Sequence, residues 1–170
     1  EDEVDATALG QVLAHEHPAG GRLTSARSVP VVAGFDVTFC APKSVSLLFA
    51  LGDAGVSAEV RRAHDRAVVD ALGLLEERAC RLRRGKHGAM VVPGEGFIGA
   101  AFAHRTSRAG DPHLHTHVLV ANMARNPADG RWSALDARSL YSWLRPAGFV
   151  YEAILRYELT ERLGVDWGPV

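Results

Sequence analysis

Three histidines occupy alternate positions in the segment DPHLHTHVLV, residues 111–120, as His113, His115 and His117. Alternate residues of a β-strand point to the same face of a sheet, so this spacing predicts a strand with three imidazoles on one face. A core strand would normally carry valine or isoleucine at such positions. Neutral imidazole is a common ligand of divalent transition metals, and the spacing therefore favours a metal site.

A fourth histidine, His104, lies on the preceding predicted strand. If SRAGDP, residues 107–112, forms the turn of a hairpin, His104 lies opposite His115 with the two Cβ atoms about 5 Å apart. His117 follows one step along the same face. We therefore predict that His104, His115 and His117 bind a metal ion and leave its other positions open, as catalytic sites do. His113, at the turn end of the strand, is expected to lie outside this ligand set.

A carboxylate is expected near these ligands, because metal-bound histidines usually need an outer partner that fixes their tautomer and orientation. Asp36 is the best candidate, since it lies between Phe35 and Val37 in an otherwise apolar predicted strand. A buried carboxylate without a partner would be energetically expensive there. The alternative is an aspartate at a sheet edge that faces water.

The rest of the pattern supplies the elements that must position these side chains. We predict a short helix near Ala6–His15 and a short helix opened by Pro42 and ended by Gly52. A long helix is expected from a cap at Ser57 to about Leu82, followed by a basic connector, RLRRGKHG. Further predicted elements are strands at 32–42, 89–92, 96–108 and 113–123, a turn at 126–132, and a helix from about 136 to 163 stopped by Gly164.

These elements predict one α+β domain over residues 1–170, in which helices flank a central antiparallel sheet that carries the histidine hairpin. Its composition, 47% hydrophobic and 23% charged, is globular, with no apolar run long enough to span a membrane and no signal peptide. Cys40 and Cys80, the only cysteines, are far apart in sequence, which disfavours a cysteine zinc site and fits a cytoplasmic protein.

Three segments resemble a known family. GFDVTFCAPKSVS, AHDRAV and HRTSRAGDPHLHTHVLVANM are similar to motifs of the MobF-type (TrwC/TraI-like) conjugative relaxases, which belong to the HUH endonuclease superfamily. The similarity runs from about Gly34 to about Leu163. It implies a relaxase-like fold and an enzyme that nicks one strand of plasmid DNA at the origin of transfer. In that reaction a tyrosine forms a 5′-phosphotyrosyl link and leaves a free 3′-OH.

The resemblance assigns the metal ligands to His104, His115 and His117 and the histidine-orienting aspartate to Asp36. The implied cofactor is a divalent ion, Mg²⁺ or Mn²⁺ in cells, with Zn²⁺ or Ni²⁺ as alternatives. The implied partners are single-stranded DNA at the origin of transfer and other relaxosome and secretion-system proteins.

The net charge of −1 predicts no strong nonspecific attraction to DNA, so phosphate contacts must come from local clusters. One cluster lies in the basic connector, a second flanks the histidine hairpin, and a lysine opens the helix after the aspartate strand. A solvated connector is the alternative interpretation of the first cluster. The candidate DNA-binding residues are Lys43, Arg83, Arg84, Lys86, Thr106 and Arg108.

The sequence departs from the family pattern in its tyrosines. The nucleophiles of the family lie near the N-terminus, whereas the first tyrosine here is Tyr141, followed by Tyr151 and Tyr157 in the predicted C-terminal helix. We therefore expect these residues to form the metal-bearing part of the site without the N-terminal tyrosine segment. Alternatives are a replication-initiator arrangement with Tyr151 or Tyr157 as nucleophile, a three-histidine metallohydrolase, and a fragment that binds metal or DNA without catalysis.

Overall fold

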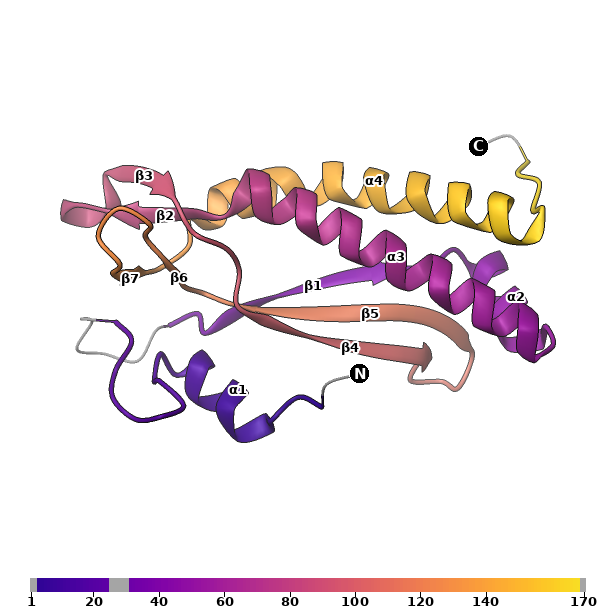
Figure 1. Ribbon diagram of the computed structural model, residues 1–170, viewed down its shortest axis with the longest axis horizontal. Helices are drawn as coiled ribbons and strands as arrows, with labels where there is room; N and C mark the ends of the chain where they lie inside the picture. Colours follow the sequence, from indigo (N-terminus) through magenta and orange to yellow (C-terminus); the bar gives the residue numbers. More distant parts are fainter. Residues whose placement is uncertain (1–2, 25–30, 169–170) are drawn as a thin grey trace. The chain divides into compact units, whose positions relative to one another are not determined.

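The computed structural model describes residues 3–24 and 31–168, apart from the side chain of residue 87, and Figure 1 shows its elements. The helices are α1 (Ala6–Leu13), α2 (Lys43–Leu51), α3 (Ala54–Ala79) and α4 (Ala137–Leu163), with a short 3-10 helix η1 (Lys86–Gly88). The strands are β1 (Gly34–Cys40), β2 (Arg81–Arg84), β3 (Met90–Pro93), β4 (Gly99–Thr106), β5 (Pro112–Ala121), β6 (Ala124–Arg125) and β7 (Trp132–Ser133).

The histidine strand β5 is the central strand of a three-stranded sheet with the order β1-β5-β4. A tight turn joins β4 to β5, where the backbone N–H of Ser107 donates to the carbonyl of Asp111 and Gly110 adopts a positive φ. The α+β class, with helices flanking antiparallel strands and a histidine hairpin in the sheet, is therefore confirmed.

Two glycines allow the strands beside β5 to approach it closely. A Cβ added at Gly34 would lie 2.6 Å from the carbonyl oxygen of Val120, and one added at Gly99 would lie 2.7 Å from that of Leu119. Real Cβ atoms do not come this close to a backbone oxygen. Glycine at both positions is thus a condition for normal strand pairing here.

The long helix starts earlier than predicted. Asp53, not Ser57, caps α3, because its Oδ1 accepts a hydrogen bond of 2.9 Å from the N–H of Val56. The hydroxyl of Ser57 donates instead to the carbonyl of Phe49, at 2.7 Å. The helix also ends at Ala79, three residues before the predicted end. The prediction missed that an aspartate directly before Ala54 is an equally good cap.

The expected basic connector is a strand. Residues 81–84 form β2, which pairs antiparallel with β3. Its other edge meets the segment before α4, since the N–H of Arg83 donates to Ala134 and the N–H of Asp136 donates to Arg81. Leu82 supplies the apolar contact that fixes this strand, because its side chain is completely buried. The sequence prediction missed β2 because three of its four side chains are arginines.

The last helix agrees with the sequence prediction. Asp136 caps α4 by accepting hydrogen bonds from the N–H and the hydroxyl of Ser139. The helix ends at Leu163, and Gly164 follows with a φ of +65°. None of the helices formed by the described residues is both long and apolar enough to cross a membrane.

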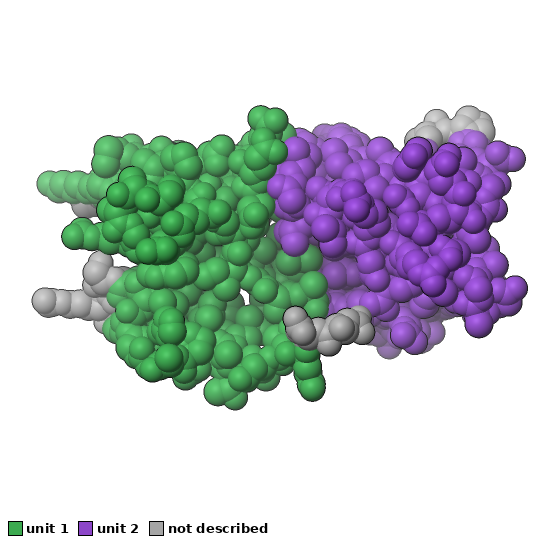
Figure 2. Space-filling view, viewed as in Figure 1, with its two compact units in different colours: residues 1–37, 75–101, 118–143 green, residues 38–74, 102–117, 144–170 purple. Residues whose placement is uncertain are grey.

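The described chain forms two compact units, coloured separately in Figure 2. Unit 1 comprises residues 1–37, 75–101 and 118–143, and unit 2 comprises residues 38–74, 102–117 and 144–170. Unit 1 has a core that includes Leu75, Leu82, Met123 and Leu140, whereas Val60, Leu114, Leu155 and Leu159 are buried in unit 2.

Candidate metal centre

His104, His115 and His117 come together in unit 2, as the strand spacing predicts. Their ligand nitrogens all lie within 4.8 Å of one another. The ring of His104 lies 5.0 Å from that of His115 and 5.2 Å from that of His117. Because His115 is buried while His104 is exposed, the cluster rests on the sheet and opens towards solvent. Three histidines from adjacent strands thus form one side of a site.

The donor set fits a divalent transition metal. Three neutral imidazoles provide nitrogen ligands, and tetrahedral bonds of about 2.1 Å would place those nitrogens about 3.4 Å apart. The observed limit of 4.8 Å is close enough for small ring rotations to reach that spacing. The residues that would hold the ion are therefore the three that the hairpin register singles out.

Backbone and hydroxyl groups orient two of the rings. Nδ1 of His115 lies 2.8 Å from the carbonyl oxygen of His113. A carbonyl can only accept a hydrogen bond, so this Nδ1 carries the proton and Nε2 keeps its lone pair for a metal. Nδ1 of His117 lies 3.1 Å from the hydroxyl of Thr38 on β1. The cluster does not include His113, and the predicted place of His113 outside the ligand set stays a prediction.

Asp36, predicted to orient a histidine, is exposed on β1. The alternation along β1 buries Val37 and Phe39 on one face and leaves Asp36 and Thr38 exposed on the other. The premise that Asp36 is buried in an apolar strand was thus wrong, because only alternate residues of β1 enter the core. Its role towards the histidines stays a prediction.

A row of buried polar side chains lies on the face of β5 opposite the histidines. The side chain of Thr116, between His115 and His117, makes a 2.8 Å hydrogen bond with Nε2 of His64 on α3. Nδ1 of His64 makes a second bond, also 2.8 Å, with the hydroxyl of Tyr151 on α4. His64 is 0% exposed, and burial lowers its pKa to about 4, so its imidazole is neutral at pH 7.

The tyrosines differ sharply in exposure. Tyr151 is only 2% exposed, and burial raises the pKa of its hydroxyl well above the usual range. Tyr141 and Tyr157 are both 63% exposed. Tyr151 therefore packs and hydrogen-bonds inside unit 2, where a DNA phosphate cannot reach its hydroxyl without local opening.

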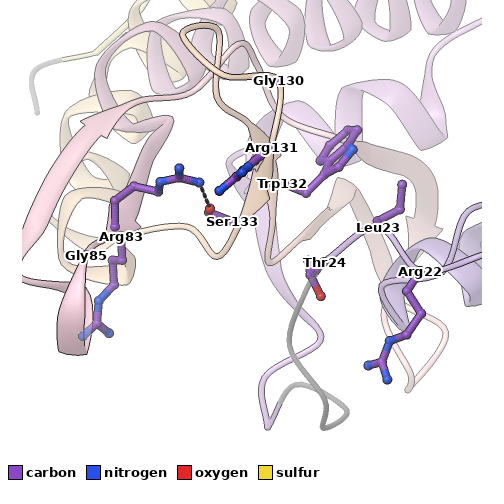
Figure 3. Close-up of a pocket in the computed structure, with 10 residues that line it drawn as sticks. Arg22, Leu23, Thr24, Arg83, Gly85, Gly130, Arg131, Trp132 and Ser133 are labelled. Atoms are coloured by element: carbon purple, nitrogen blue, oxygen red, sulfur yellow. Dashed lines mark hydrogen bonds between the residues drawn. The ribbon is translucent and has the colours of Figure 1, made fainter.

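A polar pocket of about 700 Å³ lies in unit 1 (Figure 3). Its walls come from the segment before residue 25, from β2 and from the turn that leads into β7. Arg84 donates a 2.9 Å hydrogen bond to Ser133 and forms an ion pair with Asp129. The lining residues that bear on the chemistry are Arg22, Arg83, Arg84, Arg131, Trp132 and Thr24.

The predicted DNA contacts fall at different places in the structure. Arg83 and Arg84 line this pocket, whereas Lys86 is exposed in η1. Thr106 and Arg108 are exposed at the end of β4 and in the following turn. The ammonium of Lys43 donates to the carbonyl of Pro112 at the start of β5, at 3.0 Å.

Sequence reasoning missed several residues that the structure brings to these places. Arg22, Arg131 and Trp132 come together with Arg83 only in the folded chain. His64 and Thr116 stand 52 residues apart in the sequence. Two signals were available for His64: it is a polar residue among the apolar positions Val60, Ala63 and Ala67 of the predicted long helix, and it lies in AHDRAV, which resembles a family motif.

The antiparallel sheet, its flanking helices and the three-histidine site agree with the HUH-type endonuclease fold that the sequence motifs resemble. Comparison with known proteins identifies one family within that class. The family model of the TrwC relaxase matches residues 1–170. The chain therefore belongs to the TrwC relaxase family, a family of DNA nickases and transesterases.

Individual relatives support the same family. The multifunctional conjugation protein TraI of Escherichia coli is 39% identical over 105 residues, which are 61% of this chain and 6% of TraI. The conjugative relaxase TrwC, in a metal-free complex with oriT DNA, superposes with a TM-score of 0.83 at 35% identity. That match covers 99% of this chain and 58% of the TrwC chain.

A copper-bound structure of TrwC with oriT DNA has a TM-score of 0.80 and 38% identity, over 94% of this chain and 54% of that one. This chain thus spans less than two thirds of each relative. At this level, it is a TrwC-like conjugative relaxase domain with a three-histidine metal site.

Proposed function

We propose that this chain forms the metal-binding part of a relaxase site that nicks one strand of DNA at an origin of transfer through a phosphotyrosyl intermediate. The observation that carries the proposal is the convergence of His104, His115 and His117 on one open site, within a chain of the TrwC relaxase family. The copper-bound TrwC structure with oriT DNA supports both the metal and the DNA.

The protein's own groups prepare the site for a phosphate. The carbonyl of His113 holds His115 in the tautomer whose Nε2 can bind a metal ion, and the hydroxyl of Thr38 contacts Nδ1 of His117. We assign Asp36 to orienting a histidine. A divalent ion bound by three neutral ligands would keep its full charge and stabilise the negative charge that develops on the scissile phosphate. Mg²⁺ or Mn²⁺ is the proposed ion in cells.

The proposed DNA strand binds through phosphate contacts. Thr106 and Arg108 project from the end of the histidine hairpin, and Lys43 adds a cation beside the start of β5. In unit 1 the pocket of Figure 3 provides further guanidinium groups, including Arg83 and Arg84, and the indole of Trp132. Arginine suits phosphate, and an indole can stack on a base, so this pocket suits one nucleotide of a single strand.

The tyrosine nucleophile is not assigned to the buried Tyr151. Following the family resemblance, we place the protein in the cytoplasm and expect other relaxosome and secretion-system proteins as its partners. A three-histidine metallohydrolase is the second candidate, since the open side of the cluster could also hold a reactive water.

A cleavage assay separates the candidates. The protein is incubated with Mn²⁺ and 3′-labelled single-stranded oligonucleotides that tile the transfer origin of a conjugative plasmid. A 5′-phosphotyrosyl link carries the 3′ label into an SDS-resistant complex with the protein. When the tested protein includes the family's N-terminal tyrosine segment, we expect this complex with the wild type and with His17→Ala, an exposed histidine outside the cluster, and its loss with His117→Ala.

Each other product points to a different function. Cut DNA without a protein link would support the hydrolase. Bound but uncut DNA would support a role in DNA binding without catalysis. Peptide mapping of a linked product identifies the tyrosine, and a link at Tyr157 would support the replication-initiator arrangement instead.

A further inference from the structure

Strand β5 has two chemically different faces. One face presents His115 and His117, and the other is packed against helices α3 and α4 of the same unit. Thr116, between the two ligands, is 4% exposed and turns its hydroxyl into this packed face. The backbone of Thr116 therefore links the metal cluster to the interior of unit 2.

The interior contact is a continuous row of hydrogen bonds. Thr116, His64 and Tyr151 are joined by two bonds of 2.8 Å each, and all three side chains are buried. A neutral imidazole has one donor and one acceptor nitrogen, so it can satisfy one partner at each end. The ring of Tyr151 is held further by Phe39 of β1, whose centroid lies 5.5 Å away.

Stability alone does not explain this row. Burying three polar side chains costs their hydration, and their hydrogen bonds only offset that cost, so apolar side chains of the same shape could fill the space as well. A fully satisfied polar row has a different advantage, because it is satisfied in a single arrangement and therefore specifies the geometry of the elements that it joins.

That geometry matters at β5. The relative position of His115 and His117 depends on the backbone between them, which is the backbone of Thr116. On the other side of His115, the N–H of Leu114 donates to the buried hydroxyl of Ser46 on α2, at 3.0 Å. The strand is thus held by hydrogen bonds on both sides of His115.

We propose that the row of Thr116, His64 and Tyr151 is a positioning device that holds β5 so that His115 and His117 meet a metal ion in the correct geometry. The inference rests on the proposed metal site and adds three positioning residues to it. These residues act on the ligands through the strand and need not touch the ion.

The test compares Thr116→Val with Thr116→Ser. Valine has nearly the shape of threonine but lacks the hydroxyl, whereas serine keeps it. Binding of Co²⁺ is measured by calorimetry, and the visible absorption of bound Co²⁺ reports ligand geometry. We expect Thr116→Val to weaken Co²⁺ binding about tenfold, at the low end of the effect of groups that support metal ligands, and to alter the absorption spectrum. Thr116→Ser should restore both.

Two further variants guard against a trivial loss of stability. Tyr151→Phe keeps the ring and removes only the far hydroxyl, so it should weaken Co²⁺ binding less than Thr116→Val while the protein remains folded. Ser57→Ala removes a hydroxyl of the same unit that bonds to the carbonyl of Phe49 and lies away from β5 in sequence. It should lower the unfolding temperature but leave Co²⁺ affinity and spectrum unchanged.

The outcomes separate the two hypotheses. Unchanged Co²⁺ affinity and spectrum in Thr116→Val would overturn the positioning role while the metal site stands. An equal loss in Ser57→Ala would also overturn it, because the effect would then be general destabilisation. Failure of the wild type to bind Co²⁺ at all would reject the metal site on which the inference rests.

Discussion

At His115 a single backbone carbonyl decides which ring nitrogen is left for a metal. The carbonyl of His113 accepts from Nδ1, so Nε2 remains available without help from a carboxylate. From the sequence we predicted an aspartate as the group that orients a histidine, whereas the partner of the His115 ring is the main-chain oxygen of His113. An alternating strand provides such an oxygen at every position, and residue types alone do not reveal it.

Removal of one ligand should abolish tight metal binding. Supporting groups already change affinity by about 10- to 100-fold, so loss of a direct ligand in His115→Ala should weaken Co²⁺ binding by more than about 100-fold. Calorimetric titration measures the effect. The exposed His17→Ala variant provides the control, and a similar loss there would contradict the assignment.

His64 should make stability depend on pH. Burial, with smaller contributions from Arg61 and His115 and an opposing one from Asp65, lowers its pKa from 6.5 to about 4. The unfolded chain therefore binds more protons between pH 6.5 and 4, so the free energy of unfolding falls as the pH drops through this window and levels off below it. The loss should reach roughly 3 kcal/mol.

The variant His64→Gln keeps one donor and one acceptor but does not titrate. Urea unfolding of the wild type and His64→Gln at pH 7, 5.5 and 4.5 isolates the contribution of His64, since other groups titrate in both proteins. The difference between the two proteins should shrink towards low pH. A constant difference would show that His64 is not held neutral in the fold.

At the scale of elements, short polar side chains decide where helices begin. Asp53 and Ser57 are both candidate caps four residues apart, and the structure uses Asp53 for α3. At β2 the sequence prediction missed a strand, because three of its four residues are arginines, although Leu82 is buried in the core. Both cases show that boundaries depend on which backbone donors and acceptors find partners.

Replacement of the α3 cap should destabilise the protein. Asp53→Ala removes the acceptor for the N–H of Val56 and should lower the free energy of unfolding by about 1 kcal/mol. Urea denaturation measures the change. Asp53→Asn, which can still cap, should lie close to the wild type, and a loss as large as that of Asp53→Ala would count against the cap.

At the scale of the molecule, a net charge of −1 means that DNA affinity must come from local cationic groups. The pocket of unit 1 gathers arginines from separate parts of the chain, including Arg83 and Arg131. Each phosphate contact releases counterions, so binding strength should fall steeply with salt.

The salt dependence tests this pocket directly. Arg131→Ala should weaken binding of single-stranded oligonucleotides and reduce the slope of log affinity against log salt by about 0.7, the value for one phosphate contact on a single strand. Fluorescence anisotropy at several salt concentrations gives the slope. Arg66→Ala removes an exposed arginine of α3 that is paired with Asp70, and an equal change there would exclude a specific pocket.

Much of the site followed from local spacing. Alternation along one strand and the position of the turn were enough to bring His104, His115 and His117 together, because a hairpin relates residues that are close in sequence. The same holds for α4, whose cap and terminal glycine are local signals. The longest of the three family motifs covers this same hairpin.

Other features existed only once the chain had folded. Tyr151 and His64 are 87 residues apart, and Arg22 joins Arg83 and Arg131 from a distant segment. No periodicity links such residues, since their contact depends on how helices and strands pack against one another. Local patterns therefore predicted the histidine cluster, whereas the buried row behind it and the arginine pocket were decided by long-range packing.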